Sequence, residues 1–108
     1  VTRDPAHGFL LTIGAGGVLT ELWQDTVSML LPVTPAQIQS ALQNLRIAPL
    51  LNGYRGKPGA DLGAITKAIM SVQAYVIAHQ GAISEVEVNP LICGTDSAIA
   101  VDALIRRT

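Results

Sequence analysis

The chain has 108 residues, a length that suits one domain or part of one. Of these residues 49% are hydrophobic and 14% are charged, and the mean hydropathy is +0.40, which excludes a disordered tail. Seven Lys and Arg residues against eight Asp and Glu residues give a net charge of -1, which excludes the basic surface that nucleic-acid-binding and membrane-binding proteins use. Cys93 is the only cysteine, which excludes a disulfide framework and a thiolate zinc cluster and favours a reducing cytoplasm.

The N-terminal third predicts an antiparallel meander of short strands. The apolar runs Phe9–Ile13, Val18–Trp23 and Val27–Leu31 are each bounded by glycine, proline or polar residues, as strands are. Gly14-Ala15-Gly16-Gly17 follows the first run, as the glycines of a dinucleotide-binding motif would. That motif needs a third small residue where Leu19 stands, and it needs a helix next, so we prefer a plain hairpin turn.

The first predicted helix begins after Thr34. Thr34 and Gln37 have the spacing of a capping box, and Pro35 stands at the first helical position. The apolar residues that follow repeat at helical period, so we expect the helix to end near Arg46. No apolar stretch is long enough and free enough of glycine and proline to predict a transmembrane helix.

A loop and a second helix follow. Pro49–Gly59 is rich in glycine and proline around Tyr54-Arg55, a composition that predicts irregular structure. Asp61 is a suitable N-cap for a long helix, because apolar residues then recur at steps of three and four. We expect that helix to stop at Gly81.

The C-terminal part predicts a hairpin. Ile83–Asn89 alternates between apolar and polar residues, Ala98–Ile105 alternates again, and Cys93–Ser97 forms the turn between them. Strands, two helices and strands in this order predict an α+β fold, with helices packed on one face of an antiparallel sheet. A chain that opens with Val1 is expected to be a fragment of a larger protein.

The predicted hairpin gathers polar side chains on one face. Glu85, Glu87 and Asn89 alternate with valines and therefore share a face. A turn centred between Thr95 and Asp96 places Asn89 opposite Asp102, with Cβ atoms about 4.5–5.5 Å apart. In this register we expect Asp102 to share a face with two alanines, and the alternate residues to enter the core. The alanines are Ala98 and Ala100, and the expected core residues are Ile99, Val101, Ala103 and Ile105.

This pairing has two interpretations. A carboxylate and an amide oxygen at that separation form half of a magnesium site, whose other ligands come from water and phosphates. Alternatively, the glutamates form a solvated strand face and Asp102 is an exposed residue near the chain end. Pro90, directly after Asn89, removes a backbone donor from the strand, and such an irregularity often marks a site.

Other polar residues are less informative. Arg55-Gly56-Lys57 precedes the helix at Asp61, where free N–H groups favour anions, so a phosphate contact by Arg55 and a solvated turn both stay open. Glu21 has no partner in sequence, and neither His7 nor His79 stands at metal-ligand spacing. No nucleophilic triad can be assembled.

Five segments, in this order and spacing, resemble the C-terminal subdomain of the ATP-grasp domain in nucleoside-diphosphate-forming acyl-CoA synthetases. This group includes ADP-forming acetyl-CoA synthetase and relatives of the succinyl-CoA synthetase β subunit. The segments are Thr2-Arg3-Asp4-Pro5 with Gly8, Gly14-Ala15-Gly16-Gly17 through Glu21 to Asp25, Leu50–Gly56, Glu85–Leu91, and Val101-Asp102-Ala103.

The resemblance implies an activity and site roles. Such enzymes form acyl-CoA from a carboxylic acid, CoA and ATP or another nucleoside triphosphate, through acyl-phosphate and phosphohistidine intermediates. Their motif asparagine and the aspartate of the next strand hold Mg²⁺ against the nucleotide phosphates, which implies Asn89 and Asp102 here. Glu87 matches a glutamate that meets the phosphohistidine loop, although many relatives have aspartate there. Neither His7 nor His79 matches the phosphorylated histidine.

The resemblance also implies missing partners. An N-terminal ATP-grasp subdomain would complete the nucleotide site, and a domain or subunit bearing the CoA site and the phosphohistidine would complete the reaction. We therefore expect residues 1–108 to be a partial ATP-grasp domain that is inactive alone. The alternative is a regulatory or docking module of an acetyltransferase fusion protein without ligase activity.

Overall fold

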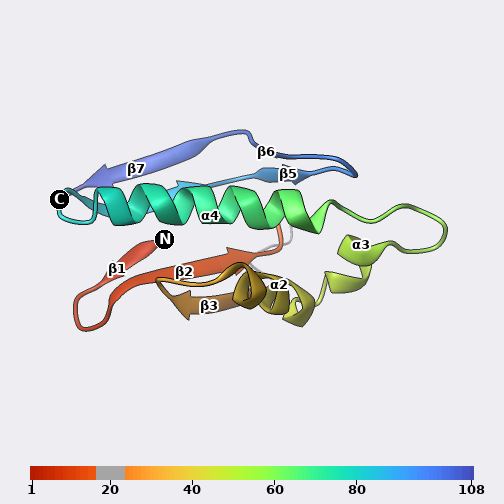
Figure 1. Ribbon diagram of the computed structural model, residues 1–108, viewed down its shortest axis with the longest axis horizontal. Coiled ribbons are helices and arrows are strands. Elements are labelled where there is room, and N and C mark those ends of the chain that lie inside the picture. The colour runs from red at the N-terminus through yellow and green to blue at the C-terminus, as the bar shows by residue number, and fades with distance from the viewer. Residues whose placement is uncertain (17–23) are drawn as a thin grey trace.

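Strands from both ends of the sequence form one antiparallel sheet. The computed structural model describes residues 1–16 and 24–108. The five-stranded sheet has the order β3-β2-β1-β4-β7, and a two-stranded sheet pairs β5 with β6. The strands are β1 Thr2–Asp4, β2 Gly8–Gly14, β3 Thr26–Leu30, β4 Ile83–Val88, β5 Leu91–Cys93, β6 Ala98–Ala100 and β7 Ala103–Arg107. Figure 1 shows α4 and α2 crossing the same side of these strands, as an α+β fold requires.

The helices begin where their caps predict. In α2, Pro35–Asn44, the Thr34 hydroxyl accepts from the N–H of Gln37 and the Gln37 side chain accepts from the N–H of Thr34, which confirms the capping box. The carboxylate of Asp61 caps α4, Leu62–Ala78. Both helices end slightly earlier than predicted. None of the helices in the described part of the chain is long and apolar enough to cross a membrane.

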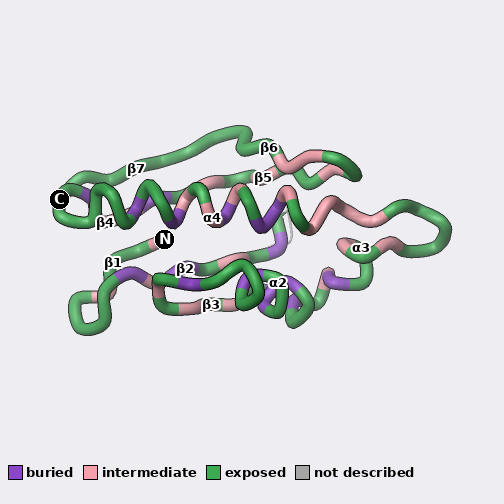
Figure 2. The backbone as a smooth tube through the Cα atoms, viewed as in Figure 1, coloured by how far each residue is buried: buried purple, intermediate pink, exposed green. Residues whose placement is uncertain are grey.

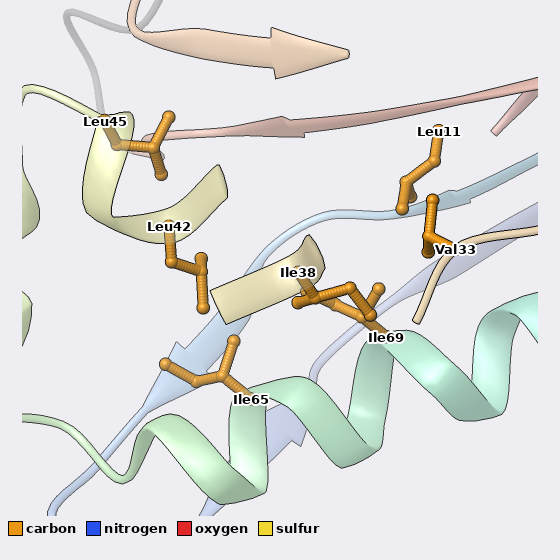
Figure 3. Packing of buried hydrophobic residues seen from close by; sticks show 7 residues of the cluster. All are labelled: Leu11, Val33, Ile38, Leu42, Leu45, Ile65 and Ile69. Carbon is orange, nitrogen blue, oxygen red and sulfur yellow. The ribbon is translucent and has the colours of Figure 1, made fainter. Parts of the chain in front are cut away.

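One face of the large sheet packs against the helices and the other is open. Leu11 of β2 packs with residues of α2 and α4 in the main core cluster. Its members are Leu11, Val33, Ile38, Leu42, Leu45, Ile65 and Ile69, all drawn in Figure 3. On the opposite face, the hydroxyls of Thr12 and Ser28 form an exposed 2.8 Å hydrogen bond, and Leu30 is exposed. Figure 2 shows burial concentrated on α2, β2 and α4, whereas β7 is exposed throughout.

The N-terminal strands differ from the predicted meander. The strand predicted at Val18–Trp23 lies outside the described residues, and β2 pairs directly with β3. Strand β1, which local pattern did not predict, lies between β2 and β4. Arg3 anchors β1 by donating to the carbonyl oxygens of Gln80 and Ile83. The turn predicted at Gly14-Ala15-Gly16-Gly17 leads into residues 17–23, so the choice between a hairpin and a dinucleotide motif falls outside the described residues.

The prediction of irregular structure from Pro49 is wrong for its first residues. Helix α3 spans Ala48–Asn52. The buried Asp25 carboxylate accepts hydrogen bonds from the N–H groups of Arg46 (2.6 Å) and Ile47 (3.0 Å), directly before this helix. A carboxylate that satisfies free N–H groups at a helix start stabilises it. Because Asp25 is distant in sequence, local composition could not reveal this support.

The prediction that alternate residues of the last strand enter the core is also wrong. Ile99, Val101 and Ile105 are 59%, 61% and 44% exposed, and Ala103 is exposed. Strand β7 is the edge of the large sheet, so its apolar residues have no covering helix. The β5–β6 ribbon is a separate sheet that instead packs Leu91 and Ala98 against the core.

A buried glutamine joins α4 to the entry of α2. The Gln73 side chain accepts from the N–H of Val33 at 2.7 Å and donates to the carbonyl oxygen of Val33 at 3.1 Å. Both residues are buried. Buried backbone groups that lose their partners destabilise the folded state by about 1–3 kcal/mol each.

We therefore expect Gln73→Leu to lower the free energy of unfolding by about 2–4 kcal/mol, because both polar groups of Val33 lose their partner. Urea denaturation measures the effect. Gln43→Leu is the matched control, since Gln43 bonds Asn52 at the surface and should cost less than about 1 kcal/mol. Equal losses in the two variants would contradict this role of Gln73.

Asp25→Ala should lower the free energy of unfolding by about 2–3 kcal/mol, because the N–H groups of Arg46 and Ile47 lose a charged acceptor. Asp25→Asn keeps one side-chain oxygen and should lose less. Asp96→Ala is the control, since Asp96 is exposed and should change stability by less than about 0.5 kcal/mol. Denaturation curves that coincide for all variants would show that the contact does not stabilise α3.

Candidate functional site

The C-terminal ladder keeps one register across Pro90. Glu87 lies opposite Leu104 and Val88 opposite Ala103, and beyond the proline Leu91 lies opposite Ala100. At the junction the N–H of Asn89 donates to the carbonyl oxygen of Asp102 at 3.1 Å. The backbone therefore places Asn89 directly opposite Asp102, and this predicted pairing is confirmed.

The junction interrupts the sheet without separating the strands. Pro90 has no N–H to donate, but its carbonyl oxygen accepts from the N–H of Val101 at 3.0 Å. The large sheet ends at Val88 and Ala103, and the small sheet begins at Leu91 and Ala100. The residues between the two sheets, including Asn89 and Asp102, are exposed. Their side chains are therefore available to a ligand.

An open hollow of about 300 Å³ lies at this junction, and Glu87, Asn89, Asp102, Ala103 and Leu104 line it. The pairing of β4 with β1 puts Glu85 on the same sheet face as Thr2 and Leu10, which is the face that the helices leave open. Alternation along β4 puts Glu87 on that face too. The hollow is therefore at the open face, and the structure brings the predicted residues Glu87, Asn89 and Asp102 together.

The acids beside the hollow differ in their partners. Arg106 lies opposite Glu85 and forms an ion pair with it, with 2.7 Å between Nε and Oε2. Oδ1 of Asp102 accepts from the N–H of Ala103 at 2.9 Å, which orients this carboxylate. Within the described residues, Oδ2 of Asp102 and the side chains of Glu87 and Asn89 make no hydrogen bond. Oxygen atoms from all three residues are therefore free to bind a ligand.

This donor set suits a hard cation with few protein ligands. In the described ranges, no three His, Cys, Asp or Glu residues form a group that could hold a metal ion. Asn89 and Asp102 offer one amide oxygen and one carboxylate. Mg²⁺ commonly takes one or two protein oxygens and completes its octahedron with water and phosphate oxygens. The residues present fit that pattern, whereas they do not fit a closed structural metal site.

Arg55 is not part of this group. Figure 1 shows the segment between α3 and α4 projecting at one end of the molecule, whereas the β6–β7 junction lies nearer the middle. Arg55 lies in that projecting segment, at the tip of a tight turn. The predicted contact between Arg55 and a phosphate stays a prediction.

The remaining candidates have structural surroundings. Nδ1 of His7 lies 3.5 Å from the Asp4 carboxylate, and the ring of His79 stacks on Tyr75 at the end of α4. Cys93 is an exposed residue, but packing around its sulfur raises the pKa of the thiol, which opposes a nucleophilic role at neutral pH. Glu21 lies outside the described residues.

Two contributors to the site were missed from sequence. Leu104 and Ala103 line the hollow, although Ala103 was assigned to the core and Leu104 was not considered. The hairpin register itself pairs Glu87 with Leu104, so this apolar wall could have been read from the same turn that selected Asn89 and Asp102.

Sequence comparison finds relatives that act on acids and CoA. The chain is 30% identical over 107 residues to the β subunit of acetate–CoA ligase [ADP-forming] II from Pyrococcus furiosus, a match that covers 97% of this chain and 45% of the relative. It is 34% identical over 105 residues to trans-feruloyl-CoA synthase FCS1 from an unknown prokaryotic organism, covering 95% of this chain and 15% of the relative. The chain thus spans less than half the length of these relatives.

Solved structures share the whole arrangement. PH1788 from Pyrococcus horikoshii superposes with a TM-score of 0.91 at 28% identity, covering 99% of this chain and 46% of that one. An acetyl-coenzyme A synthetase from Ca. Korarchaeum cryptofilum gives 0.90 at 29% identity, covering 99% of this chain and 50% of that one. That structure contains coenzyme A and Mg-AMPPCP, with a phosphohistidine segment pointing towards the nucleotide site.

A family assignment follows from both the residues matched and the fold. Residues 1–106 match the model of the ATP-grasp domain family, which is nearly the whole chain. The antiparallel sheet and its one-sided helices agree with that match. The chain therefore belongs to the ATP-grasp domain family.

Proposed function

We propose that residues 1–108 are the C-terminal subdomain of an ATP-grasp domain in a nucleoside-diphosphate-forming acyl-CoA synthetase. The complete enzyme would form acyl-CoA from a carboxylic acid, CoA and ATP, through acyl-phosphate and phosphohistidine intermediates. The observation that supports this most strongly is the pairing of Asn89 with Asp102 in an open hollow beside Glu87. Relatives that are acetate–CoA ligases [ADP-forming] support the reaction class.

In this proposal Asn89 and Asp102 hold Mg²⁺ against the nucleotide phosphates. Both residues line the hollow, and the N–H of Ala103 orients the carboxylate of Asp102 so that Oδ2 is available. When bound, the cation would neutralise charge on the phosphates during phosphoryl transfer. The two side chains fix where the phosphates lie, because both are anchored to a rigid backbone ladder.

Glu87 is proposed to meet the phosphohistidine loop of another domain or subunit. It lines the hollow with Asn89 and Asp102 and forms no close ion pair in the described ranges, although the Val1 ammonium there lies near enough to act on its charge. A free carboxylate can accept an imidazole N–H and so hold the ring with one nitrogen facing the phosphoryl group. The neighbouring Glu85 already forms an ion pair with Arg106, so it is a poorer candidate for that role.

The remaining parts of the site are proposed to come from outside these residues. An N-terminal ATP-grasp subdomain would cover the nucleotide from the other side, and a CoA-binding domain would supply the phosphohistidine. The hollow is wide open to solvent, which agrees with a site that is completed by another surface. We propose a cytoplasmic location, since the single exposed Cys93 suits a reducing compartment.

Asp102→Ala in the full-length protein should weaken Mg-ATP binding and lower acyl-CoA formation by about 100-fold or more, because a charged ligand of the cation is lost. Isothermal titration and a thioester assay measure the two effects. Asp96→Ala is the matched control, because it removes an exposed acid from the turn between β5 and β6. Unchanged affinity and unchanged turnover in Asp102→Ala would refute the metal assignment.

Glu87→Gln should leave Mg-ATP affinity within about twofold but slow phosphoryl transfer to the enzyme by about 100-fold or more, since it removes only the contact to the histidine. Single-turnover transfer from labelled ATP measures this step. Glu85→Gln is the control on the same strand, and we expect less than about a threefold change because Glu85 is paired with Arg106. Equal defects in the two variants would contradict the assignment.

The alternative role, a regulatory module fused to an acetyltransferase, gives a different result in the same assay. It predicts no acyl-CoA formation by the full-length protein at any nucleotide concentration. Acyl-CoA formation that is lost when Asn89 or Asp102 is substituted supports the ligase, because both residues line the proposed Mg-nucleotide site.

A further inference from the structure

The turn at Tyr54–Lys57 has an unusual backbone. The N–H of Tyr54 donates to the carbonyl oxygen of Lys57 at 3.2 Å, and the N–H of Lys57 donates back to Tyr54 at 3.0 Å. The two residues between them, Arg55 and Gly56, have φ angles of +51° and +77°. These are the features of a type I′ turn, whose first central position usually holds asparagine, aspartate or glycine. Arginine is therefore a costly choice at this position.

The arginine side chain is held in place without an acidic partner. The guanidinium carbon of Arg55 lies 5.2 Å from the centre of the Tyr54 ring, a stacked cation–π contact. Among the described residues, neither Arg55 nor Lys57 forms an ion pair. Asp61, the next acid along the chain, accepts from the N–H of Ala64 as the N-cap of α4. Stacking covers a face of the guanidinium and leaves its N–H groups free at the edge.

The base of the turn is tightly packed. Gly53 has a φ of +104°, and a Cβ there would lie 3.2 Å from the carbonyl oxygen of Lys57. A Cβ on Gly59 would lie 2.6 Å from the carbonyl oxygen of Leu51. The N–H of Ala60 also donates to Leu51 at 2.8 Å. These contacts fix the turn against α3, so Arg55 projects from a defined position.

We propose that this turn is a second anion site, which binds a phosphate group through the guanidinium edge of Arg55, assisted by Lys57. A planar guanidinium with free N–H groups matches two phosphate oxygens. Strained backbone at a residue that keeps a functional side chain is typical of a ligand site. The site lies away from the hollow lined by Asn89 and Asp102, so its phosphate is not one that the proposed magnesium holds. This inference does not depend on the proposed ligase activity.

The test is an NMR titration of the protein with inorganic phosphate at constant ionic strength. We expect saturable shifts of the amide signals of Tyr54, Arg55, Gly56 and Lys57. Arg55→Asn is the key variant, because asparagine is favoured in a type I′ turn and should preserve or raise the thermal midpoint. It should weaken phosphate binding by about tenfold or more, the loss expected for a charge-assisted hydrogen bond.

The matched control is Arg107→Gln, which removes an exposed cation from β7 and lowers the net charge by the same amount as Arg55→Asn. We expect phosphate to bind this variant like the unchanged protein. ADP, CoA and dephospho-CoA then distinguish the source of the phosphate. If CoA binds more strongly than dephospho-CoA, the group bound at the turn is the 3′-phosphate of CoA. If ADP binds more strongly than both, the group bound is the diphosphate of a nucleotide.

Three outcomes would overturn the proposal. The first is that the amide signals of the turn do not shift with phosphate. The second is that Arg55→Asn binds phosphate like the unchanged protein, and the third is that Arg107→Gln loses as much affinity as Arg55→Asn. The last result would mean that net charge alone attracts the anion. None of these binding measurements depends on acyl-CoA formation, so failure of this proposal is distinguishable from failure of the proposed function.

Discussion

The candidate site depends on one backbone register that continues through a proline. The hydrogen bond from the N–H of Asn89 to the carbonyl oxygen of Asp102 aligns the two chains where the large sheet ends. The reverse bond, from Val101 to the carbonyl oxygen of Pro90, repeats that alignment on the other side of the junction. A slip of one residue would move every side chain to the opposite face and separate the two polar residues. The register therefore determines whether the site exists.

The break at Pro90 explains why this point of the ladder is suited to bind a ligand. Strands β4 and β7 pair with each other through their backbone groups, and β4 is supported further by β1 and by α4. Beyond the proline, β5 and β6 form their own small sheet, which is tied to the start of α4 by the 2.8 Å hydrogen bond from Asp61 to Gly94. Asn89 and Asp102 thus lie between two supported ribbons. Their side chains are exposed, yet their backbone is fixed.

Local patterns predicted the parts of the fold that depend on neighbouring residues. The capping box at Thr34, the N-cap at Asp61 and the alternation around the last turn all act over a few residues, and all were found as expected. Helix α3 and strand β1 were not predicted, because Asp25 supports the first from a distance and β2 and β4 hold the second. The exposure of Ile99 and Ile105 was missed because alternation shows which residues share a face but not which face is covered.

The central claim is that Asn89 and Asp102 together bind a divalent cation next to the nucleotide. Anomalous diffraction from crystals of the full-length protein, grown with Mn²⁺ and a non-hydrolysable ATP analogue, tests it most directly. The account predicts an anomalous peak bonded to the side-chain oxygen of Asn89, to Oδ2 of Asp102 and to phosphate oxygens, at the hollow that these residues line. Manganese bound to the nucleotide with neither residue in its coordination sphere would contradict the account.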